Sequence, residues 1–516
     1  MRRLVLIAFL LSTISAFAQS SDVGDVAFAN SGKPEAQSAF LRGLALLHNF
    51  EYPTAAEMFR KAQEIDPSFA MAYWGEAMTY THPVWFQQDA EAARAALRRL
   101  GATPAERLAK APTEREKDYL RTLDVLYGEG AKNDRDFLYS DAMAALHARY
   151  PDDVDATAFY ALSLLGTAHA GRDFATYMRA AALLEEVFPS HMHHPGVLHY
   201  LIHSYDDPVH APLGMRAARL YGAVAPDAGH ALHMTSHIFV AMGMWDDVID
   251  ANRRAIAVVN RQRAERSKPN GDCGHYPTWL HYALLQKGQM EDARKALDTC
   301  RASAFPEKFV SAGPMDSAEE RLEAYADMRA AQVANGQPLT AMDSPTIASD
   351  LRAPGARFTM AYGDVLAAWQ RGDADALKAA TANLHALHKS VAEEAAKESN
   401  PTYRLRAEVM VAEADALQLI ATRKGAEALT ALENAAKAEA SMPLEFGPPV
   451  VPKPAAELFA EQLLAAGRAA DSMNAYRSVL QRTPGRKAAV EGLARAEKAA
   501  GHASASQETT AAPHVH

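Results

Sequence analysis

The chain has 516 residues, a formal net charge of −10 at pH 7 and 22% charged residues. Its length is too great for one compact core, so we expect several domains or an elongated repeat array. An acidic chain without a basic block argues against nucleic acid as a partner. Alanine and leucine are abundant and β-branched runs are scarce, which favours helices over strands.

The first eighteen residues, MRRLVLIAFLLSTISAFA, differ from the rest of the chain. Two arginines precede an apolar stretch that ends in Ala-Phe-Ala, which is typical of a secretory signal peptide (residues 1–18). An uncleaved membrane anchor is the alternative, but the apolar run is short. No other stretch approaches the ~18 apolar residues that span a bilayer. We therefore expect a periplasmic or secreted protein, with no stable membrane insertion after cleavage and a flexible N-terminal segment at residues 19–35.

The stretch GLALLHNFEYPTAAEMFRKAQEIDP contains small, aromatic and proline residues at regular offsets. These residues are Gly43, Ala55, Phe59, Ala62 and Pro67. The offsets resemble the tetratricopeptide repeat (TPR), a pair of antiparallel helices in which small residues allow close crossing and proline ends the second helix. Looser copies follow at residues 242–255, 287–297 and 466–484. The resemblance implies an all-α fold, a TPR-like α-solenoid of antiparallel helix pairs.

We expect the chain beyond its N-terminal segment to have three parts. An N-terminal TPR-like array with a histidine-rich groove covers residues 36–303, and a C-terminal TPR-like helical array covers residues 304–500. Proline-rich segments at 341–354 and 443–454 are typical of loops or linkers. Residues 501–516 are low in apolar content and are predicted to be a disordered tail. The three histidines of this tail can bind metal loosely, but a flexible tail is the simpler interpretation.

Four segments also resemble, more specifically, a branch of secreted bacterial TPR proteins. They are AYWGEAMTYTHPVW (72–85), HPGVLHYLIHSYDDP (194–208), APDAGHALHMTSHIFVAMGMWDDVIDAN (225–252) and EFGPPVVPKP (445–454). This resemblance implies an architecture and no particular chemistry.

Histidines are concentrated in the middle of the chain. Residues 191–210 contain six of them, and residues 230–237 contain three more. Two His-x-x-x-His pairs stand out, His199 with His203 and His233 with His237, and they are separated by 34 residues, one TPR period. The TPR resemblance implies that both pairs face the concave groove of the solenoid. In the same register, five further residues line this groove: His230, His275, Asp206, Tyr282 and Trp74. For the two aromatic residues, packing within a repeat is the alternative to stacking on a ligand.

The spacing of the two pairs permits a metal site. Histidines at i and i+4 share a helix face, packed helices lie about 8–10 Å apart, and an imidazole nitrogen binds an ion at roughly 2 Å. We therefore expect His199, His203, His233 and His237 to meet around one transition-metal ion. Ligation by nitrogen suits Zn, Cu, Ni or Fe. The alternative is that these histidines form hydrogen bonds to a peptide or an acidic ligand.

Asn252 aligns with a position that TPR repeats usually fill with an apolar or aromatic residue. A buried amide needs a partner, so Asn252 either holds a groove histidine in one tautomer or satisfies a backbone carbonyl.

No reaction can be assigned from these residues. The His-Glu-x-x-His signature of zinc hydrolases is missing, because Tyr200 and Met234 stand where glutamate is required. Two hypotheses remain. The first is a secreted scaffold whose histidine-lined groove binds a peptide, a protein or a small molecule. The second is a metal-binding protein or metalloenzyme, in which Asp206 acts as a base or orients a ligand.

The chain has two cysteines, Cys273 and Cys300. In an oxidising compartment such a pair is a candidate disulfide. The predicted hairpin has a first helix at about 275–287, a turn at Gly288 and a second helix at about 291–300. This hairpin brings the two cysteines close together. Two unrelated thiols are the alternative.

Overall fold

The computed structural model describes residues 22–311, 316–345, 347, 353–395 and 401–510. The predicted signal peptide and the last six residues of the predicted tail lie outside the described residues. Within them the fold is all-α, apart from one two-residue antiparallel β-pair. No described helix is both long enough and apolar enough to cross a membrane.

The helices of the N-terminal half are α1 (Pro34–His48), α2 (Tyr52–Ile65), α3 (Ala70–Met78), α4 (Ala90–Leu100), α5 (Pro104–Ala109), α6 (Glu114–Leu126), α7 (Lys132–Arg149), α8 (Val154–Leu165), α9 (Phe174–Val187), α10 (Pro195–Tyr205), α11 (Ala211–Val224), α12 (Gly229–Ala241), α13 (Trp245–Glu265), α14 (His275–Lys287) and α15 (Met290–Ala304). The strands are β1 (Thr81–His82) and β2 (Gln87–Gln88), and two 3-10 turns are η1 (Pro83–Trp85) and η2 (Phe188–Ser190).

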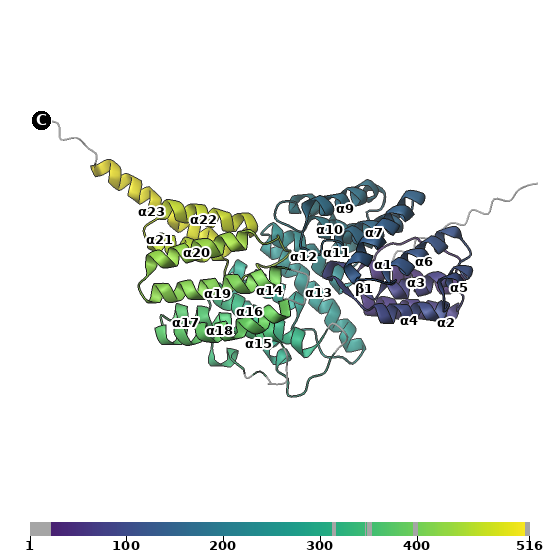
Figure 1. Ribbon diagram of the computed structural model, residues 1–516, viewed down its shortest axis with the longest axis horizontal. Helices are drawn as coiled ribbons and strands as arrows, with labels where there is room; N and C mark the ends of the chain where they lie inside the picture. The colour runs from purple at the N-terminus through teal and green to yellow at the C-terminus, as the bar shows by residue number, and fades with distance from the viewer. Residues whose placement is uncertain (1–21, 312–315, 346, 348–352, 396–400, 511–516) are drawn as a thin grey trace, which may run out of the picture.

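The C-terminal half contains α16 (Ala318–Ala334), η3 (Ala341–Asp343), α17 (Pro354–Gln370), α18 (Ala374–Ala395), α19 (Pro401–Ala421), α20 (Gly425–Ala440), α21 (Ala455–Ala465), α22 (Ala469–Arg482) and α23 (Lys487–Thr510). Consecutive helices pack against each other along the described chain, which gives the stacked pairs of a TPR-like solenoid (Figure 1).

The repeat pattern in the sequence corresponds to helical hairpins. The first copy forms α1 and α2, where a side chain at Gly43 would press on the ring of Phe59. The copies at 242–255, 287–297 and 466–484 follow the turns of α12–α13, α14–α15 and α21–α22. Gly288 ends α14 with a φ of 79°, a conformation that favours glycine.

The N-terminal segment expected to be flexible is packed where the structure describes it. Val23, Val26 and Phe28 are buried, and Phe28 contacts the rings of Trp74 and Tyr119. Flexibility was the wrong prediction for these three residues, because their apolar side chains belong to the hydrophobic core.

The predicted disordered tail also begins too early. Helix α23 continues to Thr510, ten residues into the tail predicted to start at residue 501. Alanine and glutamate residues after position 501, with no proline before Pro513, allow the helix to continue.

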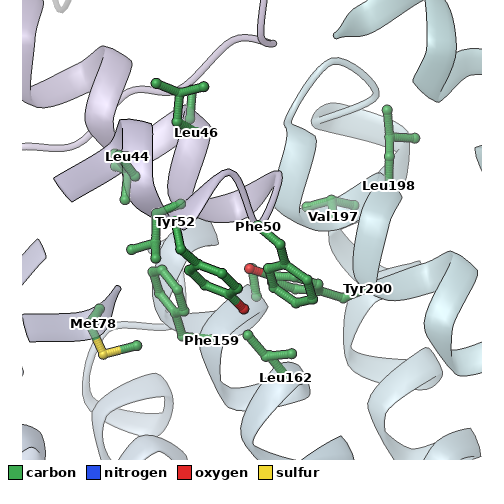
Figure 2. Close-up of a cluster of buried hydrophobic side chains, with 14 of the residues drawn as sticks. Leu44, Leu46, Phe50, Tyr52, Met78, Phe159, Leu162, Val197, Leu198 and Tyr200 are labelled. Carbon is green, nitrogen blue, oxygen red and sulfur yellow. The ribbon is translucent and has the colours of Figure 1, made fainter. Parts of the chain in front are cut away.

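A cluster of buried hydrophobic side chains joins α1 and α2 to α8 and α10 (Figure 2). Phe50 lies in the α1–α2 turn and Tyr52 is the first residue of α2. Their rings stack on each other, with centroids 5.2 Å apart. Phe50 also packs against Tyr200 of α10 and against His199 on the same helix. This turn therefore places a hydrophobic cover over the histidines of α10.

Cys273 and Cys300 form a disulfide, with their Cα atoms 4.3 Å apart. Cys273 directly precedes α14 and Cys300 lies near the end of α15, so the bond closes the hairpin of these two helices. Both residues are buried. The bond lies two residues from His275, the first residue of α14, and holds the start of that helix in place.

Removing this disulfide is expected to lower the free energy of unfolding by about 3–4 kcal/mol in the chain-entropy model. The reason is that the bond links residues 27 apart and restricts the unfolded chain. The measurement is chemical denaturation of the parent protein and of a Cys273→Ser/Cys300→Ser variant. Reductant is the control, since it must affect only the parent. Equal stability of the two proteins would contradict the prediction.

Candidate functional site

The histidine-rich segments form α10 and α12, two helices that are buried on all sides. Every residue of both helices is buried, and α12 lies near the middle of the molecule (Figure 1). Helix α10 begins with Pro195 in its first turn, and Nδ1 of His194 accepts a hydrogen bond from the backbone N–H of Val197. An open groove was therefore the wrong expectation for the histidines of these helices, because other elements of the protein cover them.

The turn between α1 and α2 makes three contacts with the site. The carbonyl of His48 accepts a hydrogen bond of 2.6 Å from Nδ1 of His199. The ring centroid of Phe50 lies 4.2 Å from that of His199. The carboxylate of Glu51 accepts the backbone N–H of His230 at 3.0 Å and so caps the start of α12. The histidines of the two helices thus contact a turn that lies 151 residues earlier in the chain for His199 and 179 residues earlier for His230.

His199, His203 and His230 form the first group of convergent rings. One nitrogen of each lies within 4.8 Å of the corresponding nitrogens of the other two. Nδ1 of His199 donates to His48, and Nδ1 of His203 donates to Asp206 at 3.3 Å. The Nε2 atoms of all three histidines are buried and have no hydrogen-bond partner. At His199 and His203, the bonded Nδ1–H leaves a lone pair on Nε2.

His233, His237 and His275 form the second group, also within 4.8 Å. Nδ1 of His233 donates to Oδ1 of Asn252 at 2.7 Å, and Nδ1 of His237 donates to Asp206 at 2.9 Å. Their Nε2 atoms face each other at 3.2 Å. His275 is exposed at the start of α14, with its ring centroid 4.5 Å from that of His233.

The four predicted ligands belong to overlapping groups of converging side chains. His199 and His203 pair with His230, while His233 and His237 pair with His275. His203 and His237, one from each His-x-x-x-His pair, also lie within 4.8 Å of each other and of Asp206. None of these groups contains all four predicted ligands. The helical spacing correctly places each pair on one face, but the partner of each Nδ1 decides where its ring points.

Asn252 performs both of the roles considered for it. Its Nδ2 donates to the carbonyl of Val248 at 2.9 Å, which leaves Oδ1 to accept from His233. This arrangement keeps the proton of His233 on Nδ1 and directs Nε2 to the second group.

Asp206 connects the two groups. One of its carboxylate oxygens accepts hydrogen bonds from both His203 and His237, and the other binds the guanidinium of Arg172. Burial alone would raise the pKa of Asp206, but Arg172 and the two histidines hold it well below its usual range. Asp206 is therefore an ionised carboxylate that orients the rings of His203 and His237 through their Nδ1 atoms.

Burial lowers the pKa of His199 and His230 in the first group and of His233 and His237 in the second. Desolvation lowers the pKa of His237 to about 4, although Asp206 opposes the shift. The pKa values of His199, His230 and His233 fall well below 6.5, again through desolvation first and neighbouring histidines second. These imidazoles are neutral at pH 7, which is the form that binds metal ions.

Aromatic rings enclose the histidines. Trp279 of α14 lies 4.7 Å from His233 and 4.5 Å from His237, measured between ring centroids. Phe446, in the loop between α20 and α21, stacks on His237 at 4.9 Å. No motif in the sequence marks these rings, Phe50 or Arg172 as parts of the site. The one available signal was the EFGPPVVPKP segment, which contains Phe446.

Two residues expected to line the groove lie in the core instead. Trp74 packs among the rings of Phe28, Tyr119 and Phe159. Tyr282 is buried and accepts a hydrogen bond from Arg486. Placing both in a ligand groove was wrong, because the helix face predicted to be concave is covered by other parts of the chain.

A third group, His48, Asp155 and His194, forms a hydrogen-bond network. His48 and His194 both donate through Nε2 to Oδ1 of Asp155, at 2.9 and 3.4 Å. The remaining nitrogens are also engaged, because Nδ1 of His48 accepts from the hydroxyl of Tyr200 and Nδ1 of His194 accepts from Val197. Since all four ring nitrogens are used, this group supports the α1–α2 turn.

Comparisons with known proteins add only distant structural similarity. No family model matches the chain, and no curated protein matches it. Among solved structures, the APC/C hetero-tetramer Cut9–Hcn1 is 12% identical, with 91% of this chain and 78% of that chain covered and a TM-score of 0.34. Yeast Tom70 is 11% identical, with 92% of this chain and 97% of that chain covered and a TM-score of 0.33. The TPR-like architecture follows from the stacked helical hairpins of the chain itself.

Proposed function

We propose that the protein is a metalloprotein in which His199, His203 and His230 bind one transition-metal ion. The observation that carries this proposal is the set of three buried Nε2 atoms without a hydrogen-bond partner. Leaving one buried polar atom unsatisfied costs about 1–3 kcal/mol, and the three rings converge, with one nitrogen of each within 4.8 Å of one nitrogen of the others. An ion bound to all three removes that cost.

The arrangement behind these rings supports the same proposal. Histidines that bind metal usually donate their other ring N–H to a carbonyl or a carboxylate. His199 donates to the carbonyl of His48 and His203 donates to Asp206. Nitrogen ligation without a thiolate suits Zn, Cu, Ni or Fe.

Three protein ligands leave one position of a tetrahedral ion open for water or substrate, as in catalytic rather than structural sites. The enclosing aromatic rings favour a small molecule as the ligand of this position, since a peptide backbone needs a wider opening. The TPR-like helices act as the scaffold that holds the ion. The Cys273–Cys300 disulfide supports a periplasmic or secreted location, where such bonds persist.

The test is a titration of the metal-free mature protein with Zn(II), followed by calorimetry. His502, His514 and His516 are first replaced by alanine, so that tail histidines do not bind the ion. We expect tight binding, and a loss of affinity of more than about 100-fold at this group in the variant His230→Asn, because removing an outer partner alone costs 10–100-fold.

The matched control is His193→Ala, which removes a histidine whose side chain is 68% exposed in the loop before α10. This control variant should bind Zn(II) like the parent. Failure of the parent to bind Zn(II), or unchanged binding in His230→Asn, would overturn the proposed function.

A further inference from the structure

We infer that a second transition-metal ion binds beside the first, held by His233, His237 and His275. The ligand set of this second ion is independent of the first, and only the description of the two as a pair rests on the proposed function. The sharpest observation is the distance of 3.2 Å between Nε2 of His233 and Nε2 of His237.

Neither nitrogen of this close pair can donate a hydrogen bond to the other. The proton of His233 is on Nδ1, bound to Oδ1 of Asn252, and the proton of His237 is on Nδ1, bound to Asp206. Two lone pairs therefore face each other in a buried site. Such an approach is repulsive unless a cation lies between them. Two imidazole nitrogens bound to one tetrahedral ion at 2.0–2.1 Å are about 3.3 Å apart.

A proton is a poor candidate for that cation. Both rings are buried, and an imidazolium ion is costly to hold in the interior. The charged side chains that face the pair are Asp206, which favours a cation, and Arg172, which lies behind Asp206 and neutralises it. A metal ion with an added ligand from a third ring satisfies both lone pairs at once.

His275 supplies that third ring and gives the second group its access to solvent. It is exposed, whereas His233 and His237 are buried. It lies two residues after Cys273, so the Cys273–Cys300 disulfide limits how far the start of α14 can move. One ligand of the second group therefore lies at the surface, whereas all three ligands of the first group are buried.

Asp206 makes the two groups a single unit. The same oxygen accepts from His203 of the first group and from His237 of the second. The ring centroids of these two histidines are 5.5 Å apart. Each ion would have three neutral nitrogen ligands and no carboxylate. This donor set selects Cu or Zn over Mg, Ca or Mn.

The experiment measures stoichiometry by titrating the metal-free protein with Co(II), followed by its visible absorption, in the background without tail histidines. We expect two equivalents for the parent and for the control His193→Ala. We expect one equivalent of Co(II) per chain for His275→Ala and one for His230→Asn. The variant with both substitutions should bind no Co(II) tightly. His275 is exposed, so its replacement leaves the packing of α10 and α12 unchanged.

The outcomes separate the two proposals. If His275→Ala loses one equivalent and His230→Asn loses none, the second site stands and the proposed first site fails. If the parent binds one equivalent and His275→Ala binds the same, the second site is overturned. A parent that binds two equivalents, both retained in His275→Ala, would also overturn it. Loading with Cu(II) gives an independent check, since two neighbouring ions broaden each other's electron paramagnetic resonance signal and His275→Ala should remove that broadening.

Discussion

The variant Arg172→Leu is expected to be less stable than the parent by about 3–5 kcal/mol, the cost of leaving a buried charge without its partner. The side chain of Arg172 is 3% exposed and binds Asp206 and Asp207, whose side chains are fully buried. Leucine would remove the positive charge and leave both carboxylates in the interior. The free energy of unfolding of the metal-free protein, from urea denaturation, is the measurement.

Arg216→Leu is the matched control for this prediction. Arg216 forms an ion pair with Glu185, but its side chain is 64% exposed. Surface ion pairs contribute about 0–1 kcal/mol, so this change should have a small effect. Equal effects of the two leucine variants on the free energy of unfolding would exclude a buried ion pair at Arg172.

The variant Arg172→Leu should also bind metal about 10–100-fold more weakly at both histidine groups, because Asp206 would lose its orientation.

Acidification is expected to destabilise the metal-free protein strongly between pH 6.5 and pH 4. The folded-state pKa values of His48, His237 and His281 are about 4, lowered first by desolvation, while an unfolded histidine titrates near 6.5. In this interval the unfolded chain binds more protons, so stability falls as pH falls. Each such histidine lowers the free energy of unfolding by about 1.4 kcal/mol for each pH unit of acidification in this interval.

The measurement is the free energy of unfolding of the metal-free protein at several pH values from 7.5 to 4.5. The slope of the free energy of unfolding against pH should decrease by about 1.4 kcal/mol per pH unit in His281→Leu, which removes one buried titrating ring. It should stay unchanged in His385→Ala, because the side chain of His385 is 48% exposed. Bound Zn(II) should preserve stability to lower pH, since the ion competes with protons for the Nε2 atoms. A stability that does not depend on pH in this range would mean that these rings are not buried and neutral.

Much of the architecture could be predicted from local sequence. The small residues and the proline of the first repeat predict a helical hairpin, and α1 and α2 form it. The turn at Gly288 and the hairpin around it were placed within a few residues. These features depend on contacts between neighbouring segments, which short patterns encode.

The burial of the site could not be predicted in the same way. The repeat register indicates which face of α10 and α12 carries histidines, but the covering residues, Phe50 and Phe446, lie far away in the chain. The contacts of these two rings with the histidines depend on tertiary packing, and neither residue belongs to a histidine motif.

The grouping of the ligands has a similar explanation. Spacing alone places His199 with His203 and His233 with His237, and it treats His230 and His275 as further groove residues. The third member of each group is decided by ring orientation, which follows from acceptors such as the carbonyl of His48. Arg172 follows α8 in a connecting segment, and no pattern in the sequence marks it as the partner of Asp206.

The most direct test of the central claim is anomalous X-ray scattering from crystals grown with Zn(II), recorded on both sides of the zinc absorption edge. The account predicts two peaks. One should lie about 2.0–2.1 Å from the Nε2 atoms of His199, His203 and His230, and the other should lie at bonding distance from His233, His237 and His275. A map with no anomalous peak within bonding distance of either histidine group would contradict the account.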